Sequence, residues 1–282
     1  MTLPARAILA NLLAFVLFAG CLPHGLTRAQ GLVDLELVLT VDVSLSMDVE
    51  EQRLQRDGYV AAFRDPEVWR AIASGPSGRI AVTYVEWAGA TVQATVLPWT
   101  LIDGPVAAQV FADALEAKPI SRAQMTSISG ALLYAASVLN TNPFKGRRQV
   151  VDVSGDGPNN AGATVELARE ALLARGIVIN GLPIQIKSGG PYSAFDIPNL
   201  DQYYSDCVIG GPGAFSLPVR ERGQLATAIR RKLILEISGL QSWGEPSLIP
   251  AQAPFGPATP QAADCLIGEK MWHRYMRERS RE

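Results

Sequence analysis

Oxygen-bearing side chains stand at three points where the sequence leaves or enters a regular element. A strand-like run at residues 32–41 leads into Asp42, Ser44 and Ser46, whose two-residue spacing puts these side chains on one side of an extended segment. Thr126 stands in a loop before a helical pattern, and Asp156 follows a second strand-like run between two glycines. Hard divalent cations such as Mg²⁺ prefer oxygen ligands. The pattern therefore predicts a cation site formed by Asp42, Ser44, Ser46, Thr126 and Asp156.

Only Asp42 and Asp156 bring charge to this set, so they balance a divalent cation with no negative charge to spare. Such an ion stays electrophilic and open to a carboxylate from outside. Each piece also has a simpler explanation, since Ser44, Ser46 or Thr126 can cap a following helix, and Asp156 can be a turn residue. The position of all three pieces at one predicted sheet edge favours the cation site.

The elements that must position these residues alternate along the chain. Strands are expected at 32–41, 78–89, 91–102, 147–154 and 177–186, and helices at 104–118, 127–140, 162–176 and 221–238. A further helix is expected to begin at residue 47 and to end near Asp65-Pro66. A glycine turn between the second and third strands predicts a hairpin or an adjacent pair. Strands that alternate with helices predict an α/β fold, with a mainly parallel central sheet and helices on both faces. Ligands of such sheets bind beyond the carboxyl ends of the strands.

The order Asp-x-Ser-x-Ser at 42–46, then Thr126, then Asp156 resembles the metal-ion-dependent adhesion site of the von Willebrand factor A (VWA) domain, along residues 31 to about 238. More narrowly, "DLELVLTVDVSLSMD", "YVEWAG", "VVDVSGDGPNN", "DCVIGGPGAF" and "AIRRKLILEI" resemble an uncharacterised bacterial family of exported proteins, catalogued as a domain of unknown function. The resemblance implies a Rossmann-like VWA fold, with Mg²⁺ or Mn²⁺ held at the top of the sheet by the five residues above. It leaves the biological task open.

Two classes of function are compatible with such a site. In the first, the bound cation completes its shell with a Glu or Asp of a protein partner. Candidates for the rim of this site are Trp87, Asn159, Asn160 and the long segment 191–218, although packing also explains Trp87 and turn formation the two Asn. The alternative is a metal-dependent hydrolase. A non-enzymatic role is favoured, because His273 is the one histidine beyond the first 30 residues and no serine or cysteine stands in a recognisable nucleophile setting. A structural domain that has lost metal binding is a third alternative.

Composition narrows the partners and the compartment. The formal charge is −2, and no basic stripe occurs except the short C-terminal stretch "HRYMRERSRE", which mixes both signs; both features argue against nucleic acid. Residues 1–29 have the order of a secretory signal peptide, with an apolar run from Ala7 to Gly20 and cleavage expected before Gln30. The protein is therefore expected to be exported, periplasmic or secreted; the alternative is a lipoprotein anchored at Cys21. Because no later run of 18 apolar residues occurs, we expect no transmembrane helix after signal removal.

The rest of the chain divides into a VWA-like domain at 30–238 and a Pro-rich C-terminal extension at 239–282, which is expected to be an extended appendage. Cys207 and Cys265 remain once Cys21 is set aside, and in an oxidising compartment such a pair is expected to form a disulfide. Two separate buried thiols are the alternative, since the distance between the Cα atoms decides.

Overall fold

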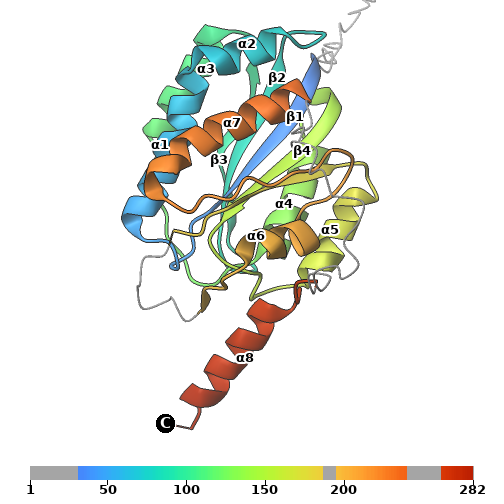
Figure 1. The fold of residues 1–282 in the computed structure, drawn as a ribbon. Coiled ribbons are helices and arrows are strands. Elements are labelled where there is room, and N and C mark those ends of the chain that lie inside the picture. The colour runs from blue at the N-terminus through green and yellow to red at the C-terminus, as the bar shows by residue number, and fades with distance from the viewer. Residues whose placement is uncertain (1–30, 187–194, 240–261, 282) are drawn as a thin grey trace, which may run out of the picture.

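The computed structural model describes residues 31–186, 195–239 and 262–281. A five-stranded sheet lies between two layers of helices (Figure 1). The strands are β1 (Gly31–Asp42), β2 (Ile80–Trp87), β3 (Gln93–Ile102), β4 (Phe144–Gly155) and β5 (Val178–Pro183), in the order β3-β2-β1-β4-β5. All neighbours pair in parallel except β2 and β3, which form the expected antiparallel pair. The predicted α/β fold, with a mainly parallel sheet, is confirmed.

The helices are α1 (Val49–Arg64), α2 (Pro66–Ala73), α3 (Pro105–Glu116), α4 (Ile128–Asn140), α5 (Val165–Leu173), α6 (Leu200–Tyr203), α7 (Leu225–Ser238) and α8 (Ile267–Arg279), with a π-helical turn at Tyr204–Val208 and a 3₁₀ turn at Arg222–Gln224. The helix expected to end near Asp65-Pro66 is α1, which ends at Arg64, and α2 follows it as a second helix that was not expected. Pro66 cannot continue α1, and it starts α2 behind the N-cap Asp65, whose side chain accepts from the Glu67 amide at 2.7 Å.

The central strand β1 supplies two hydrophobic cores. Leu35, Leu37 and Leu39 pack with α1, α2, α3 and α7 on one face, whereas Val38 packs with α4 and α5 on the other. Successive side chains of a strand point to opposite faces, so a strand buried on both sides reads as a continuous apolar run. This double burial explains the sequence of residues 32–41.

The C-terminal extension begins where α7 ends at Gly239, whose φ of 65° is the left-handed conformation typical of a glycine after a helix. Residues 240–261 of this extension lie outside the described residues. The part from 262 onward is not an extended appendage, because it contains α8, which projects from the edge of the domain (Figure 1). Within the described ranges, the model contains no helix with the length and apolar character needed to span a bilayer.

Candidate metal centre

The carboxyl end of β1 is the point at which the connections diverge. The chain leaves β1 through α1 toward β2 on one side, while β4, which follows α4, pairs on the other side. In open α/β sheets this switch point is where ligands bind. The register pairs Val41 with Ser154, so Asp42 and Gly155 end neighbouring strands at the same edge. Two of the three predicted pieces therefore meet because β1 and β4 are parallel.

A chain of hydrogen bonds joins four of the five predicted residues. The Ser44 amide donates to Asp42 Oδ1 at 2.7 Å, and the hydroxyl oxygens of Ser44 and Ser46 lie 2.7 Å apart. The Ser46 hydroxyl donates to Asp156 Oδ1, also at 2.7 Å. The oxygens of these side chains are thus gathered at one place.

Helix capping does not account for the serines or for Thr126. Asp48 is the N-cap of α1, with its carboxylate accepting from the Glu51 amide at 2.8 Å. Ser127 is the N-cap of α4 and accepts from the Gly130 amide at 3.1 Å. The simpler explanation of Ser44, Ser46 and Thr126 as caps is therefore wrong.

Thr126 is held beside the other pieces by its backbone. Its amide donates to the side chain of Asn160 at 2.9 Å, and its carbonyl accepts from the Asn160 amide at 2.8 Å. Met125, with a φ of 70°, makes the preceding turn. Ser44, Ser46 and Thr126 then line one cavity of about 240 Å³.

The electrostatics of the two carboxylates suit a cation. Asp42 is fully buried, and its Oδ2 has no hydrogen-bond partner among the described residues. Burial raises the pKa of Asp42 to about 7. Burial, followed by the negative charge of Asp42, raises the pKa of Asp156 well above its usual range. No Lys or Arg of the described residues forms an ion pair with either group.

The donor set also limits what kind of ion fits. In the described part of the chain, no group of three or more His, Cys, Asp and Glu side chains could hold a metal ion. An ion at this edge therefore has to rely on hydroxyl and water oxygens beside Asp42 and Asp156. A ligand set with two carboxylates and mostly neutral oxygens favours a hard cation that retains bound water molecules.

Some residues at this edge carry no signal in the sequence. Tyr204 is fully buried, and its hydroxyl has no hydrogen-bond partner among the described residues. A Cβ added to Gly155 would lie 2.9 Å from Asp42 Oδ2 and 3.0 Å from the Tyr204 hydroxyl, so both oxygens flank the same small space. Tyr204 comes from the π-helical turn, far along the chain from the metal loops.

The candidate rim residues differ in whether they line the cavity. Trp87 and Asn159 are fully buried, and the Asn159 side chain accepts from the Ser129 amide at 3.0 Å, so packing explains them. Asn160 does line the cavity. The cavity wall also includes Phe195 and Asp196, which belong to the candidate rim segment 191–218. The sequence did not indicate the remaining wall residues, which come from α8: Trp272, Tyr275, Met276 and Arg279.

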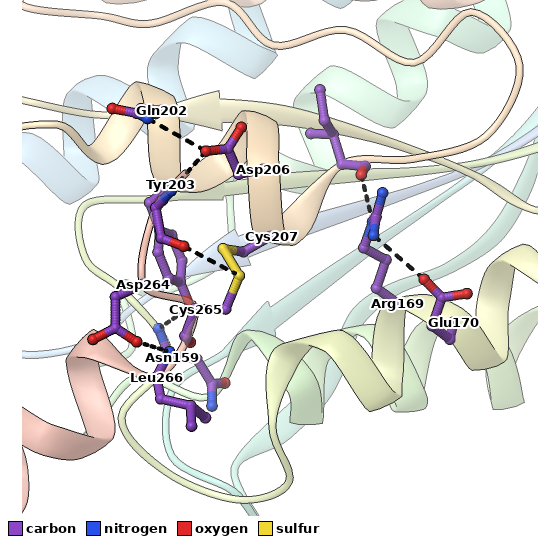
Figure 2. Close-up of a disulfide and its surroundings, with 12 residues drawn as sticks. Asn159, Arg169, Glu170, Gln202, Tyr203, Asp206, Cys207, Asp264, Cys265 and Leu266 are labelled. Atoms are coloured by element: carbon purple, nitrogen blue, oxygen red, sulfur yellow. Dashed lines mark hydrogen bonds and ion pairs between the residues drawn. A yellow bond between two sulfur atoms is a disulfide. The ribbon is translucent and has the colours of Figure 1, made fainter. Parts of the chain in front are cut away.

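Cys207 and Cys265 form a disulfide, with their Cα atoms 5.5 Å apart (Figure 2). The expected bridge is confirmed, and the alternative of two separate thiols is wrong. The bond joins the π-helical turn that carries Tyr204 to the segment just before α8.

This sheet order, with the Asp-x-Ser-x-Ser segment at the end of the central strand, defines a VWA-type domain of the α/β class. Residues 32–241 match the model of the family described as "Protein of unknown function (DUF1194)", and the chain belongs to this family. No curated protein matched the sequence.

Solved structures support the fold. Proximal thread matrix protein 1 from the mussel byssus superposes with a TM-score of 0.54 at 14% identity, covering 74% of this chain and 49% of that one. The pilus adhesin SpaC from Lactobacillus rhamnosus GG gives a TM-score of 0.54 at 12% identity, covering 73% of this chain and 30% of the adhesin. A form of the mussel protein described "with zinc occupied MIDAS motif" gives 0.50 at 14% identity, over 74% of this chain and 47% of that one. This chain therefore matches half or less of each relative's length.

Proposed function

We propose that this domain binds a divalent cation, Mg²⁺ or Mn²⁺, through Asp42, Ser44, Ser46, Thr126 and Asp156, and thereby binds a Glu or Asp of a protein partner. The observation that carries the proposal is the buried Oδ2 of Asp42, which has no hydrogen-bond partner among the described residues and lies beside the hydrogen-bonded chain to Asp156. A buried polar atom without a partner is costly, so it indicates a missing ligand. The mussel protein with zinc at its MIDAS motif supports a divalent cation at such an edge.

Each residue has a distinct part in this proposal. The Ser44 amide orients Asp42, the Ser46 hydroxyl orients Asp156, and the Asn160 side chain holds the Thr126 loop against both. A bound cation would supply an electrophilic position for an outside carboxylate, since Asp42 and Asp156 are the only charged groups among its five proposed ligands. The protein's own task is to keep these oxygens preassembled.

The proposal extends to the compartment and to the division of the chain. We propose that residues 1–29 are a signal peptide, that 30–238 are the VWA domain and 239–282 its extension, and that the protein acts after export. The Cys207–Cys265 disulfide supports export, because such bonds persist in oxidising compartments. The lipoprotein anchored at Cys21 stays the alternative.

Calorimetric titration of the mature chain, residues 30–282, with Mg²⁺ and Mn²⁺ tests the site. We expect one site in the native chain and in Asp57→Asn, an exposed control on α1, and at least about tenfold weaker binding by Asp42→Asn. Equal affinity of Asp42→Asn and Asp57→Asn would overturn the assignment. Metal-dependent turnover of a phosphate or carboxylic ester that disappears in Asp156→Ala would instead favour the hydrolase.

A further inference from the structure

Helix α8 is anchored beside the metal centre. Gly268 packs so closely on the backbone carbonyl of Asn159 that an added Cβ would collide with it. The Asn159 side chain donates to Glu269 at 2.7 Å, and the disulfide at Cys265 holds the residues before the helix (Figure 2). The first turn of α8 is therefore held against the loop that follows Asp156.

The helix then forms the wall of the cavity that faces the metal loops. Trp272, Tyr275, Met276 and Arg279 line it from α8, while Ser44, Ser46 and Thr126 line it from the domain. Phe195 completes an aromatic cluster, with its ring centroid 5.9 Å from that of Trp272 and 5.4 Å from that of Tyr275. Aromatic side chains from Phe195 and α8 thus line one part of the cavity, and the hydroxyl-bearing side chains of Ser44, Ser46 and Thr126 line another.

The size of the cavity limits what enters it. Sites that bury a drug-sized ligand typically measure about 300–1,000 Å³. The volume here is about 240 Å³, which suits one or two amino-acid side chains better than a whole small molecule.

The outer half of α8 carries an excess of positive charge. Arg274, Arg277, Arg279 and Arg281 are all exposed, with Glu278 as the one acidic residue described among them. No carboxylate of the described residues lies within ion-pair distance of these arginines. Arg279 instead lies over the Tyr275 ring, 5.8 Å from its centroid, at the cavity wall.

We propose that α8 is the second half of the binding site and that its occupant is an acidic polypeptide segment of a partner. In this segment, the metal-binding Asp or Glu is flanked by a bulky apolar residue that fills the cavity against Trp272 and Tyr275. A further carboxylate of the segment pairs with Arg279. Trp, Tyr and Arg are the residue types that most often dominate binding energy at interfaces. The inference rests on the proposed function.

Panning a phage-displayed random heptapeptide library on the immobilised mature chain in Mg²⁺, with elution by EDTA, tests the inference. The eluted peptides should carry an Asp or Glu beside Trp, Phe or Leu, together with a second acidic residue. A selected peptide should then bind Trp272→Ala about tenfold more weakly than native protein, whereas Trp272→Phe should keep most of the affinity.

The charged contact has its own matched pair of variants. Arg279→Gln should weaken the same peptide about fivefold, and Arg277→Gln, which alters an exposed arginine outside the cavity wall, should change its affinity less than about twofold. Circular dichroism and intact disulfide content identify any variant that fails to fold. Arg279→Gln serves as the test if Trp272→Ala is misfolded, because Arg279 is exposed.

The outcomes separate the two proposals. EDTA-eluted peptides without an apolar neighbour, or with equal affinity for native protein and the α8 variants, would overturn the role of α8 and leave metal-dependent binding standing. An absence of EDTA-eluted peptides would overturn the proposed function and the inference with it. Sedimentation with phosphatidylglycerol vesicles tests an anionic membrane as the other source of negative charge. If Arg279→Gln loses vesicle binding but binds the peptide as native protein does, α8 is a membrane-binding helix and the inference is overturned.

Discussion

At the scale of single residues, Gly155 separates two buried oxygens that lack partners in the described part of the chain, Asp42 Oδ2 and the Tyr204 hydroxyl. The absence of a side chain at Gly155 keeps this space open. Gly157, two residues further along, has no atom within 4 Å of an added Cβ. An added methyl group would therefore contact the carboxylate of Asp42 at Gly155, whereas at Gly157 it would contact no other atom of the described residues.

Gly155→Ala should weaken Mg²⁺ binding by about tenfold or more, because its methyl group would displace the carboxylate of Asp42. Gly157→Ala should leave the affinity unchanged, and both variants should keep the native fold. Calorimetric titration of the two variants beside the native chain is the measurement. Native affinity in Gly155→Ala would show that the space beside Asp42 has no part in metal binding.

At the scale of elements, α7 is joined to the sheet by a buried charged cluster. The Lys232 ammonium lies 2.7 Å from a carboxylate oxygen of Asp152 on β4 and also pairs with Glu236 one turn further along α7. Asn180 on β5 donates to Glu236 at 3.0 Å. Burial and the charge of Asp152 raise the pKa of Glu236 to about 7, and burial also raises the pKa of Asp152. Two carboxyl groups thus share one ammonium.

This cluster predicts a pH dependence of stability. The folded protein binds more protons than the unfolded chain between the ordinary Glu pKa of 4.5 and about 7, so the stabilisation is present at pH 4.5 and is lost as pH rises toward 7. The unfolding free energy should fall by about 1–3 kcal/mol over this window through Glu236. Glu236→Gln should remove this slope, and the exposed Glu166→Gln should keep it.

Urea unfolding at several pH values in EDTA measures the difference between native protein and each variant. Other charged or titratable groups act on the cluster: Tyr59, whose hydroxyl lies 3.4 Å from Asp152, Tyr84, Tyr204 and Arg148. All are present in native protein and in both variants, so they cancel in the comparison. Parallel pH profiles for native protein and Glu236→Gln would contradict the prediction.

The anchoring of α8 is a second property at this scale. The disulfide closes a loop with a sequence separation of 58, for which the chain-entropy model gives a stabilisation of about 4 kcal/mol. In Cys207→Ser/Cys265→Ser, the amides of α8 should exchange with solvent much faster, while those of β1 and β4 stay protected. Hydrogen exchange with mass spectrometry measures both, and reduction of the native protein should give the same pattern. Unchanged protection of α8 would show that Asn159, Glu269 and packing suffice.

At the scale of the whole molecule, the two ends of β1 face opposite ways. Its first described residue, Gly31, lies at the amino end of the strand, and Asp42 lies at the carboxyl end with the cavity and α8 (Figure 1). A strand of 12 residues spans roughly 40 Å.

The proposed export makes a prediction about the mature chain. Protein recovered from the periplasm or the medium should begin at Gln30, because signal peptidases cleave after small residues such as Ala29. N-terminal sequencing and intact mass measure this end. A protein in the membrane fraction that begins at a lipidated Cys21 would establish the alternative anchor instead.

The sequence by itself determined the sheet, most of its helices and the five oxygen-bearing residues at its edge. Local features carry this information: the apolar run of a doubly buried strand, the helical period, and the two-residue spacing of Asp42, Ser44 and Ser46. The same local pattern left helix capping by Ser44 or Ser46 open, since both serines precede a predicted helix. Only the backbone geometry assigned the cap to Asp48.

The tertiary structure decided what surrounds those residues. The hydroxyl of Tyr204, from the π-helical turn, and the carboxylate of Asp42 flank the same space at Gly155. Cys207 is bonded to Cys265, and Trp272 and Thr126 line one cavity, although each pair is far apart in the chain. Such contacts depend on how packed layers bring distant segments together, which no local pattern encodes. The five residues of the proposed cation site can therefore be identified from the sequence, whereas the cavity wall that α8 forms beside them is defined only by the folded molecule.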